Sequence, residues 1–596
     1  MLRYVLLSGI GLYFTTICLA VEQMAEPTVL RPDYLHEHDP ELTVPPAIYY
    51  LQPATVELWL EALQHSEQEL RRLAAWSLAQ ACQRQLITRD AVIPALIRAI
   101  QRPENRPNTL AALADALISL QAEETADELW KLAQRQNYAL RRIVEPALAR
   151  WKYLPAQEVW QQRVEQYHPQ VPSPTASEVQ WALQGLAALQ QTQAASNIEN
   201  ILMHRQVRDD VRRLAARTLA QLPAVDGLRL ADQLLHLQNP PATIVERCCA
   251  LELLANAPPH DAVPRLTRLL DDAVPLVSAK AFCELARQAP EIALTHLASQ
   301  RLSTESVARL CALELMRTHP DEQRLEWLVT SLADTHREVR EQAQRAIHSL
   351  ADQTQWQVQL RLAVRRMLSG ESPEGQEQAA LLIAAWNDKE AVESLMKLQL
   401  SPVPRVRVAA AYSLRCLAVP ETAPGLLSLA AELTRRRVAG EIDDSRAVDR
   451  HVAHLFEVLG TLRYHEAEPL LRQYIPKNQT LGEYSRCAAI WALGRLYEGR
   501  DDAALAAQLR GRLEDISSMP PEIEPVRRQC ALTLGRMQAR SQYDDLRRFL
   551  GDEVDPDPVE IALKWALEQI NPVRLPDPQP RRIPVGNWFL TATPQP

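Results

Sequence analysis

Apolar residues recur along residues 321–351 with the period of an α-helix, in two successive stripes. The first stripe contains Leu325, Leu328, Val329 and Leu332. The second contains Val339, Ala343, Ile347 and Leu350. Members of the first stripe fall at i, i+3, i+4 and i+7, so they share one face of a helix of 3.6 residues per turn. A polar break at 334–336 separates the stripes, which predicts a helix–turn–helix unit that must stack on neighbours to bury its apolar faces.

The same unit recurs through most of the chain. Successive copies of the second stripe are roughly 30 to 44 residues apart, which is typical of a helical-pair solenoid. Copies begin at Leu70, Leu110, Leu140, Val179, Val211, Val245, Val277, Val307, Val339, Gln376, Val406, Tyr484, Val526 and Val559. The pattern therefore predicts an all-α fold, a right-handed superhelical α-solenoid of about 13 or 14 helix pairs over residues 54–570.

Composition agrees with a folded helical array, and the net charge argues against one class of partner. Apolar residues make up 47% and charged residues 23% of the 596, and 16 Gly with 5 Phe suit helices better than sheets. The 42 Pro residues gather in short segments between stripes, where proline ends or opens helices. A net charge of −9 argues against a nucleic-acid partner, because phosphate binding needs an excess of Lys and Arg.

The nine cysteines show no CxxC-type spacing that would indicate a metal site. Single cysteines are scattered over the predicted helices, with one adjacent pair. They are Cys82, Cys248, Cys249, Cys283, Cys311, Cys416, Cys487 and Cys530, besides one in the leader. Because free cysteine is among the most buried residue types, we expect buried thiols, and the count alone does not establish a disulfide.

The chain begins with a segment typical of export. Residues 1–20 combine Arg3, an apolar run, and small residues Cys18 and Ala20 before a cleavage position after Ala20. This resembles a bacterial-type secretory signal; the alternative is an uncleaved membrane anchor, and either places the body outside the cytoplasm. Residues 21–53 are rich in Pro and acids and predict an extended arm. Within it, we interpret 36–39 (His-Glu-His-Asp) as solvated, since alternating side chains and no further ligands disfavour metal binding.

The second stripes follow the pattern V-R-x-x-A-A-x-x-L-x-x-L, with Asp, Glu or Ser six residues before the Arg. Asp334 with Arg340 and Ser401 with Arg407 keep this spacing. The pattern resembles the HEAT repeat in its short bacterial form, as in phycobilisome-lyase-type proteins. The resemblance implies a structural role for these pairs, fixing the turn and bonding to the next repeat, and little about function. The Val526 copy departs from it, with Pro521 six residues before Arg527.

No catalytic signature is present: the sequence lacks a Gly-rich phosphate loop, a G-x-S-x-G elbow and an H-E-x-x-H pair. We therefore predict no enzymatic activity, no cofactor and no metal. Most of the 12 Trp fall within or beside apolar stripes and are expected to fill the core or its rim. Trp588 lies instead in the Pro-rich tail, residues 571–596, where it either folds back as a cap over the last repeat or docks on a partner.

Residues 434–454 interrupt the repeat most strongly. A run of arginines is followed by an acidic loop, and insertions in solenoids often map to the binding surface. Candidate partner-binding residues here and in the tail are Arg435, Arg436, Arg437, Asp443, Asp444, Arg450, His451, His454 and Trp588. His451 and His454 share a helix face, but no acid lies one turn earlier to complete a metal site. A solvated, internally salt-bridged loop is the alternative to an anion or partner site.

Together these features predict an exported, non-enzymatic scaffold that binds a protein partner along a solenoid groove. Two alternatives stay open. One is a chromophore-lyase-like HEAT enzyme subunit. The other is a cell-envelope binder of anionic polymers or carbohydrates, using arginine forks that suit carboxylate or phosphate. Membrane contact is expected only through residues 1–20, if these are not cleaved.

Overall fold

The computed structural model describes residues 29–590, except 136–137, 172, 224, 238–240, 443, 479 and 552–553. The expected signal or anchor at residues 1–20 lies outside this range. The described chain divides into two compact units: unit 1 contains residues 29–44 and 313–577, and unit 2 contains residues 45–312 and those from 578 onward. Among the described residues, no helix is both long and apolar enough to cross a membrane.

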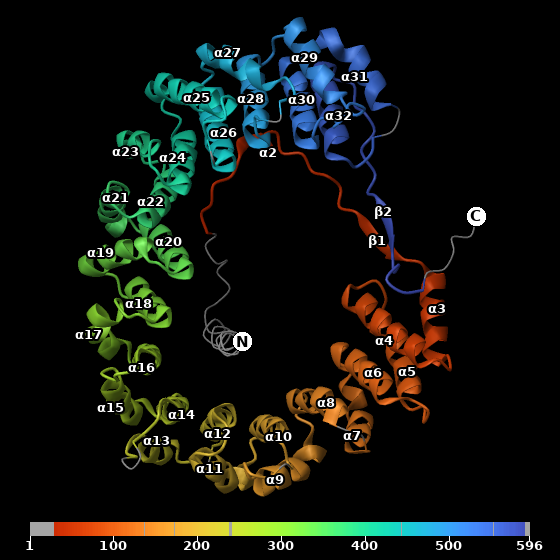
Figure 1. Cartoon of the computed structure of the whole chain (residues 1–596), viewed down its shortest axis with the longest axis vertical. Helices are drawn as coiled ribbons and strands as arrows, with labels where there is room; N and C mark the ends of the chain where they lie inside the picture. The colour runs from red at the N-terminus through yellow and green to blue at the C-terminus, as the bar shows by residue number, and fades with distance from the viewer. Residues whose placement is uncertain are drawn as a thin grey trace. The chain divides into compact units, whose positions relative to one another are not determined.

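Each unit is built from helix pairs, in which an odd-numbered first helix is followed by an even-numbered second helix (Figure 1). Unit 2 contains α3 (Pro53–Gln64), α4 (Gln68–Gln83), α5 (Arg89–Ile100), α6 (Pro107–Ser119), α7 (Ala126–Arg135), α8 (Tyr138–Arg150), α9 (Gln157–Gln166), α10 (Ala176–Ala188), α11 (Ala195–Met203), α12 (Asp209–Gln221), α13 (Gly227–Leu235), α14 (Ile244–Leu254), α15 (Pro259–Leu269), α16 (Pro275–Gln288) and α17 (Pro290–Gln300). The chain passes into unit 1 within α18 (Ser306–Thr318).

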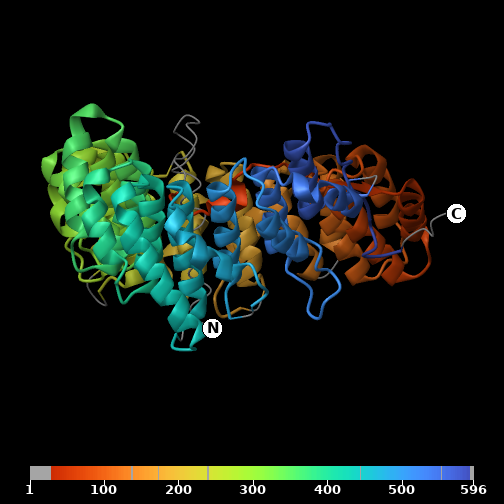
Figure 2. The same cartoon turned by 90° about the horizontal axis from the view of Figure 1, so that it is seen from above.

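Unit 1 continues the same pairing. Its helices are α19 (Glu322–Thr330), α20 (Arg337–Ala351), α21 (Thr354–Leu368), α22 (Pro373–Ala385), α23 (Val392–Leu398), α24 (Pro404–Leu417), α25 (Ala423–Val438), α26 (Ser445–Thr461), α27 (Glu468–Leu471), α28 (Glu483–Leu496), α29 (Ala503–Leu513), α30 (Glu524–Met537), α31 (Tyr543–Leu550) and α32 (Pro558–Ile570). Within each unit the second helices stack on one another as one row, here called the second-helix row (Figures 1 and 2). The expected all-α solenoid is confirmed.

The helix pairs number 15 from α3 to α32 in the described chain, against the 13 or 14 expected. The second helix missing from the predicted series is α26. The sequence predicts an irregular insertion at 434–454 because of its long spacing, arginine run and acidic loop. The helix that follows, α26, carries buried polar residues, among them Asp449, His451, His454 and Glu457. In space it packs between α24 and α28 like any other second helix. Gly460 permits this approach, since a Cβ there would lie 2.6 Å from the Trp491 ring.

Local sequence explains where the helices begin and end. Thr175 and Thr243 form capping boxes with Glu178 and Glu246, which satisfies free amides at both starts. Many other helices open with proline in the first turn. Several second helices are followed by a left-handed residue that closes the turn into the next pair, as at Ala418 after α24 (φ 44°).

The turn-fixing role implied for the polar pairs is present. The Arg340 guanidinium donates to the Asp334 carbonyl (2.8 Å), and Arg407 donates to the Ser401 carbonyl (2.7 Å). In the departing copy, Arg527 instead donates to the carbonyl of Leu513 (2.8 Å). Bonds to the next repeat occur in other copies. Arg212, which follows Val211 as Arg340 follows Val339, reaches Glu246, and Arg486 forms a two-point pair with Glu522.

The expectation of buried free thiols is wrong for two cysteines, which form a disulfide. Cys283 on α16 and Cys311 on α18 form a disulfide, with their Cα atoms 5.5 Å apart. They lie 28 residues apart, about one repeat, so consecutive second helices bring them side by side. Cys416 also departs from the expectation because it is exposed, whereas Cys248, Cys249, Cys487 and Cys530 are buried and free.

The Pro-rich ends add a small sheet to unit 2. Strand β1 (Ile48–Leu51) pairs in parallel with β2 (Arg582–Val585), which places the C-terminal tail beside the strand that leads into α3. Gly586 follows β2 with φ of 103°. A Cβ at this position would meet the Leu51 side chain at 2.6 Å, so the close approach of the two strands requires glycine.

Candidate functional site

The N-terminal arm lies against the second-helix row of unit 1. Its residues meet successive helices in chain order: Leu30 at α20, Asp33 at α24, His36 at α26 and Asp39 at α28 and α30. Figure 1 shows the short turn α2 (Leu35–His38) beside α26 and α28. We call the surface of α24, α26, α28 and α30 that contacts residues 33–39 the arm slot. It holds an extended segment by side-chain contacts.

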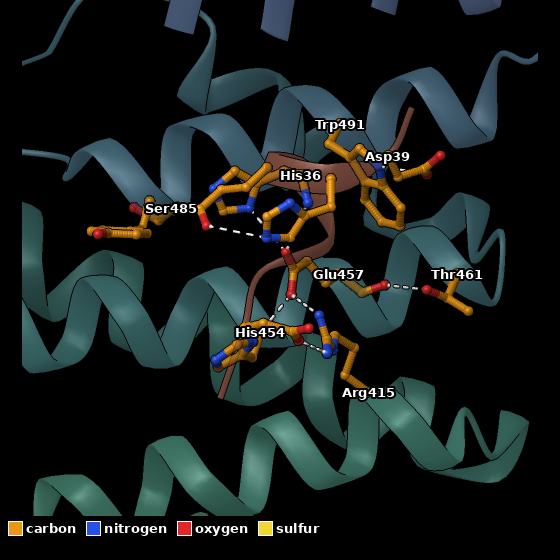
Figure 3. A network of polar contacts seen from close by, with 12 residues as sticks. His36, Asp39, Arg415, His454, Glu457, Thr461, Ser485 and Trp491 are labelled. Atoms are coloured by element: carbon orange, nitrogen blue, oxygen red, sulfur yellow. Dashed lines mark hydrogen bonds and ion pairs between the residues drawn. The ribbon is translucent and has the colours of Figure 1, made fainter. Parts of the chain in front are cut away.

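Glu457 of α26 is the centre of the arm slot (Figure 3). Its Oε1 atom lies 2.9 Å from His36 Nδ1 and accepts from the His36 backbone N–H at 3.2 Å. The other oxygen lies 3.1 Å from His454 Nδ1 and 3.5 Å from Arg415 Nη1. A carboxylate can only accept, so both histidines donate from Nδ1. Four groups from the arm, α24 and α26 therefore converge on one buried acid.

Tyr34 fills the apolar part of the slot. Its ring stacks on His454 with centroids 4.5 Å apart and planes 2° apart, and it packs against Tyr484 at 4.7 Å. Arg450 lies over the outer side of Tyr484, 5.6 Å from its centroid. Tyr34 is 9% exposed and His36 is 5% exposed, and they are the only buried residues between positions 29 and 44. The arm is thus fixed by two neighbouring side chains.

Acids of the arm meet arginines at both ends of the slot. Asp33 pairs with Arg415, whose side chain is almost fully buried. Asp39 pairs with Arg536 at 2.5 Å and accepts from Trp491 Nε1 at 3.0 Å. Such charge-assisted contacts are stronger and more directional than neutral ones. They set the position of the arm along the row.

Backbone groups complete the contact between these ends. Arg528 of α30 donates to the carbonyls of His36 (3.5 Å) and Glu37 (3.3 Å). At the start of the arm, the Leu30 amide donates to Gln344 of α20 at 2.8 Å. These bonds satisfy main-chain groups of a segment that has almost no secondary structure of its own.

The buried groups have shifted pKa values. Burial alone raises the pKa of Glu457, but hydrogen bonds from His36 and His454 outweigh it and lower that pKa to about 2. Burial lowers the pKa of His454, with the Glu457 contact opposing it. Burial, with Arg407 nearby, lowers the pKa of His451 to about 3. At neutral pH the slot therefore holds an ionised Glu457 and a neutral His454, and His451, elsewhere on α26, is neutral as well.

The structure separates the sequence-predicted candidates. Arg450 and His454 belong to the arm slot. His451 lies beneath it on α26, with Nε2 2.7 Å from Gln399 Oε1. Asp444 caps the start of α26 by accepting from the Ala447 amide at 3.0 Å. Asp443 lies outside the described residues.

The three consecutive arginines each have an acidic neighbour. Arg435 contacts Glu432 and Glu441, and Arg436 lies 3.8 Å from Glu441. Arg437 lies 3.4 Å from Asp449, which also accepts the Tyr484 and Ser485 amides at the start of α28. Local acids thus neutralise this cationic run. It is not gathered with the arm slot.

Trp588 lies far along the chain from the candidates on α26 and belongs to unit 2. It packs on Trp59 of α3 with centroids 5.7 Å apart, beneath the Arg84 guanidinium. Trp59 in turn donates to the Leu590 carbonyl at 2.7 Å. The expected cap thus covers the first helix pair, where the sequence reading placed it over the last repeat. Pairing of β1 with β2 brings the tail there.

Sequence reasoning missed the residues that complete the slot: Tyr34, Arg415, Glu457, Tyr484, Arg528 and Arg536. Its interpretation of 36–39 as a solvated segment is wrong for His36, whose side chain is 6% exposed, although it holds for His38 at 67%. The available signal was Glu457, an acid three residues after His454 on the same helix face. No cluster of three or more metal-ligating side chains occurs among the described residues.

The fold and slot define the class as an α-solenoid of stacked helix pairs with an extended segment on its second-helix row. A sequence profile described as HEAT repeats matches residues 56–149, and the pairs continue to Ile570. Residues 56–149 are therefore similar to HEAT repeats, and the helix pairs that follow are built in the same way. A search of curated proteins found no match.

Solved structures with a related chain path are large solenoids. Kap95p, in a study of its binding to RanGDP, is 14% identical with a TM-score of 0.47, covering 87% of this chain and 78% of that one. Kap121p is 15% identical with a TM-score of 0.45, covering 87% and 57%. Importin beta is 12% identical with a TM-score of 0.36, covering 86% and 82%. At these scores the likeness carries no weight for function.

Proposed function

We propose that this protein is an exported, non-enzymatic interaction scaffold whose second-helix row in unit 1 binds an extended polypeptide. One observation carries the proposal: residues 30–39 already lie along that row, with the turn α2 as their only regular element, held by side chains from α20 to α30. Solenoids of this kind use extended surfaces for recognition. The partner is a protein, because the groups that meet the arm suit backbone amides and carbonyls together with acidic and aromatic side chains.

Export is supported by chemistry as well as by the leader. The Cys283–Cys311 bridge joins neighbouring second helices, and stable disulfides are rare in the reducing cytosol. Fusion of a reporter enzyme that is active only outside the cytoplasm tests this part of the proposal. We expect activity from a fusion after residue 596, and a fusion that is produced but inactive would refute export.

Site-specific photo-crosslinking in the native envelope tests the binding surface. A photoreactive residue is placed at Glu341 on α20 or Tyr484 on α28, both in the row and beside the arm. The matched control is Val358 on α21, a first helix, where the side chain is 69% exposed. We expect a discrete protein adduct from row positions, identified by mass spectrometry. Adducts only from Val358 would show that the row is not the binding surface.

A further inference from the structure

The arm slot has the features of a peptide-recognition site that is filled by part of its own chain. On the solenoid side it presents charged and polar groups, Arg415, His454 and Glu457, all nearly excluded from solvent. Burying such groups costs free energy unless each finds a partner. On α20, by contrast, the one buried polar side chain is Gln344, which donates to Gln378 of the next second helix. The arm slot instead gathers an acid, a histidine and an arginine around one point, and part of their pairing comes from the arm.

The arm supplies what these groups lack, and in a fixed order. Asp33 forms an ion pair with Arg415, and Tyr34 stacks on His454. His36 forms a hydrogen bond with Glu457, and Asp39 forms an ion pair with Arg536. Between them, Leu35, Glu37 and His38 are partly or fully exposed. Recognition thus falls at four positions of a seven-residue stretch: acid, aromatic, any residue, histidine, two of any kind, acid.

We propose that the arm slot recognises a peptide of a partner protein, and that this peptide carries the same order of residues. Residues 33–39 of the chain itself occupy the slot in place of that peptide. This inference rests on the proposed function and names the partner chemistry at the same surface. The arm buries only Tyr34 and His36 and forms one four-residue turn, so it has no core that would hold it in place independently. A partner peptide can replace it contact for contact.

The arm competes with a partner peptide because the arm and the slot belong to the same chain. The arm is tethered to the same chain, which gives it an effective concentration that reaches the millimolar range for short flexible linkers. A partner peptide must therefore compete with a tethered rival. Weakening the arm in the intact chain removes the competitor and keeps every residue of the slot on α24, α26, α28 and α30.

Fluorescence anisotropy with a labelled synthetic peptide of residues 29–44 measures this directly. The receptors are the full chain and the full chain with Tyr34→Ser and His36→Ser. We expect the doubly substituted chain to bind the peptide at least ten times more tightly than the unsubstituted chain. Circular dichroism and a cooperative thermal transition confirm that the variant is folded. Absence of binding by the folded variant would overturn the proposal.

Single substitutions in the peptide test the residue order. Tyr34→Ala, His36→Ala and Asp39→Ala should each weaken binding at least tenfold. His38→Ala and Glu41→Ala are matched controls, because both residues are exposed, and should change it less than twofold. Equal losses for His36 and His38 would refute the order. On the slot side, Arg536→Gln should weaken binding of the unsubstituted peptide but hardly affect the Asp39→Ala peptide.

Two further outcomes separate this inference from the proposed function. If the unsubstituted chain forms dimers in light scattering that the double substitution dissociates, the slot serves a second copy and the partner claim fails. If crosslinks to a partner form from Glu341 but never from Tyr484, even in the doubly substituted chain, the row binds protein but the slot does not. Partner adducts at Tyr484 that increase when the arm is weakened support both claims.

Discussion

At the scale of single residues, Glu457 links the arm to the solenoid. It is fully buried, yet it remains ionised because His36, His454 and Arg415 surround it. A buried charge held in this way is sensitive to the loss of any one partner, since the remaining groups are left unpaired in a medium of low dielectric. The two histidines of the arm, His36 and His38, allow this sensitivity to be measured.

Replacing His36 with alanine should destabilise the docked arm. The change removes a hydrogen bond to a buried carboxylate, which typically costs about 1–3 kcal/mol. We expect thermal unfolding of the His36→Ala chain to begin at a lower temperature. His38→Ala is the control, because its side chain is 67% exposed, and should leave the transition unchanged. Equal effects of the two substitutions would place the arm elsewhere.

Stability should also fall as the pH is lowered from about 7 to 5. Burial lowers the pKa of His451 to about 3, from 6.5, and also lowers that of His454. The unfolded chain therefore takes up these protons first, and stability present above pH 6.5 is lost below it, by about 1 kcal/mol per pH unit for His451 and in the same direction for His454. Glu457, with a pKa of about 2, adds a loss only below about pH 4.5.

Chemical denaturation at several pH values checks the histidine effect. His451 faces Gln399, Arg407 and His454. Glutamine at position 451 retains polarity but cannot titrate, so His451→Gln should flatten the dependence of the unfolding free energy on pH. His260→Gln is the control, as that side chain is 79% exposed. An unchanged slope in His451→Gln would show that His451 is not the titrating group.

At this scale the sequence indicated Arg450, His451 and His454 because they lie in the segment 434–454, which interrupts the repeat. The structure places Arg450 and His454 at the arm slot. The sequence could not indicate Arg415, Arg528 or Arg536, since arginines recur at similar positions in many repeats and most of them serve the turns. Nor could it pair Glu457 with His36, 421 residues away, because no periodicity relates an extended arm to a helix.

At the scale of elements, the repeat determines which side chains meet. Equivalent positions of consecutive second helices lie side by side. For this reason the Arg212–Glu246 and Arg486–Glu522 pairs and the Cys283–Cys311 bridge each join residues about one repeat apart in sequence. Apolar periodicity predicted nearly every helix pair for the same reason. It failed for α26, because that helix bears the polar groups of the slot.

Removing the disulfide should lower the thermal stability of the chain measurably. A bridge between residues 28 apart restricts the unfolded chain by about 3 kcal/mol in the loop-entropy estimate. We expect the Cys283→Ala, Cys311→Ala chain to melt at a lower temperature, and reduction to have the same effect on the natural chain. Cys530→Ala tests a buried cysteine without a bridge. If reduction leaves the natural melting temperature unchanged, the bridge does not form.

At the scale of the whole molecule, each unit receives one terminal segment of the chain. The arm lies on the second-helix row of unit 1, and the tail pairs with β1 and covers α3 in unit 2. Composition predicted that both ends are Pro-rich and extended. It could not predict where they dock, because docking depends on groups that only the folded repeats bring together. A long solenoid leaves many surfaces available, and the arm marks one of them as a binding surface.

Hydrogen–deuterium exchange of the intact chain tests the central claim, that residues 33–39 occupy the arm slot. The His36 amide donates to Glu457, and the Glu37 and Asp39 amides donate to Tyr34 and Leu35 within the turn. We predict slow exchange at these amides in the natural chain and in His38→Ala. His36→Ala should exchange rapidly there and also lose protection in α26. Exchange of residues 34–39 in the natural chain as fast as in the free 29–44 peptide would contradict the account.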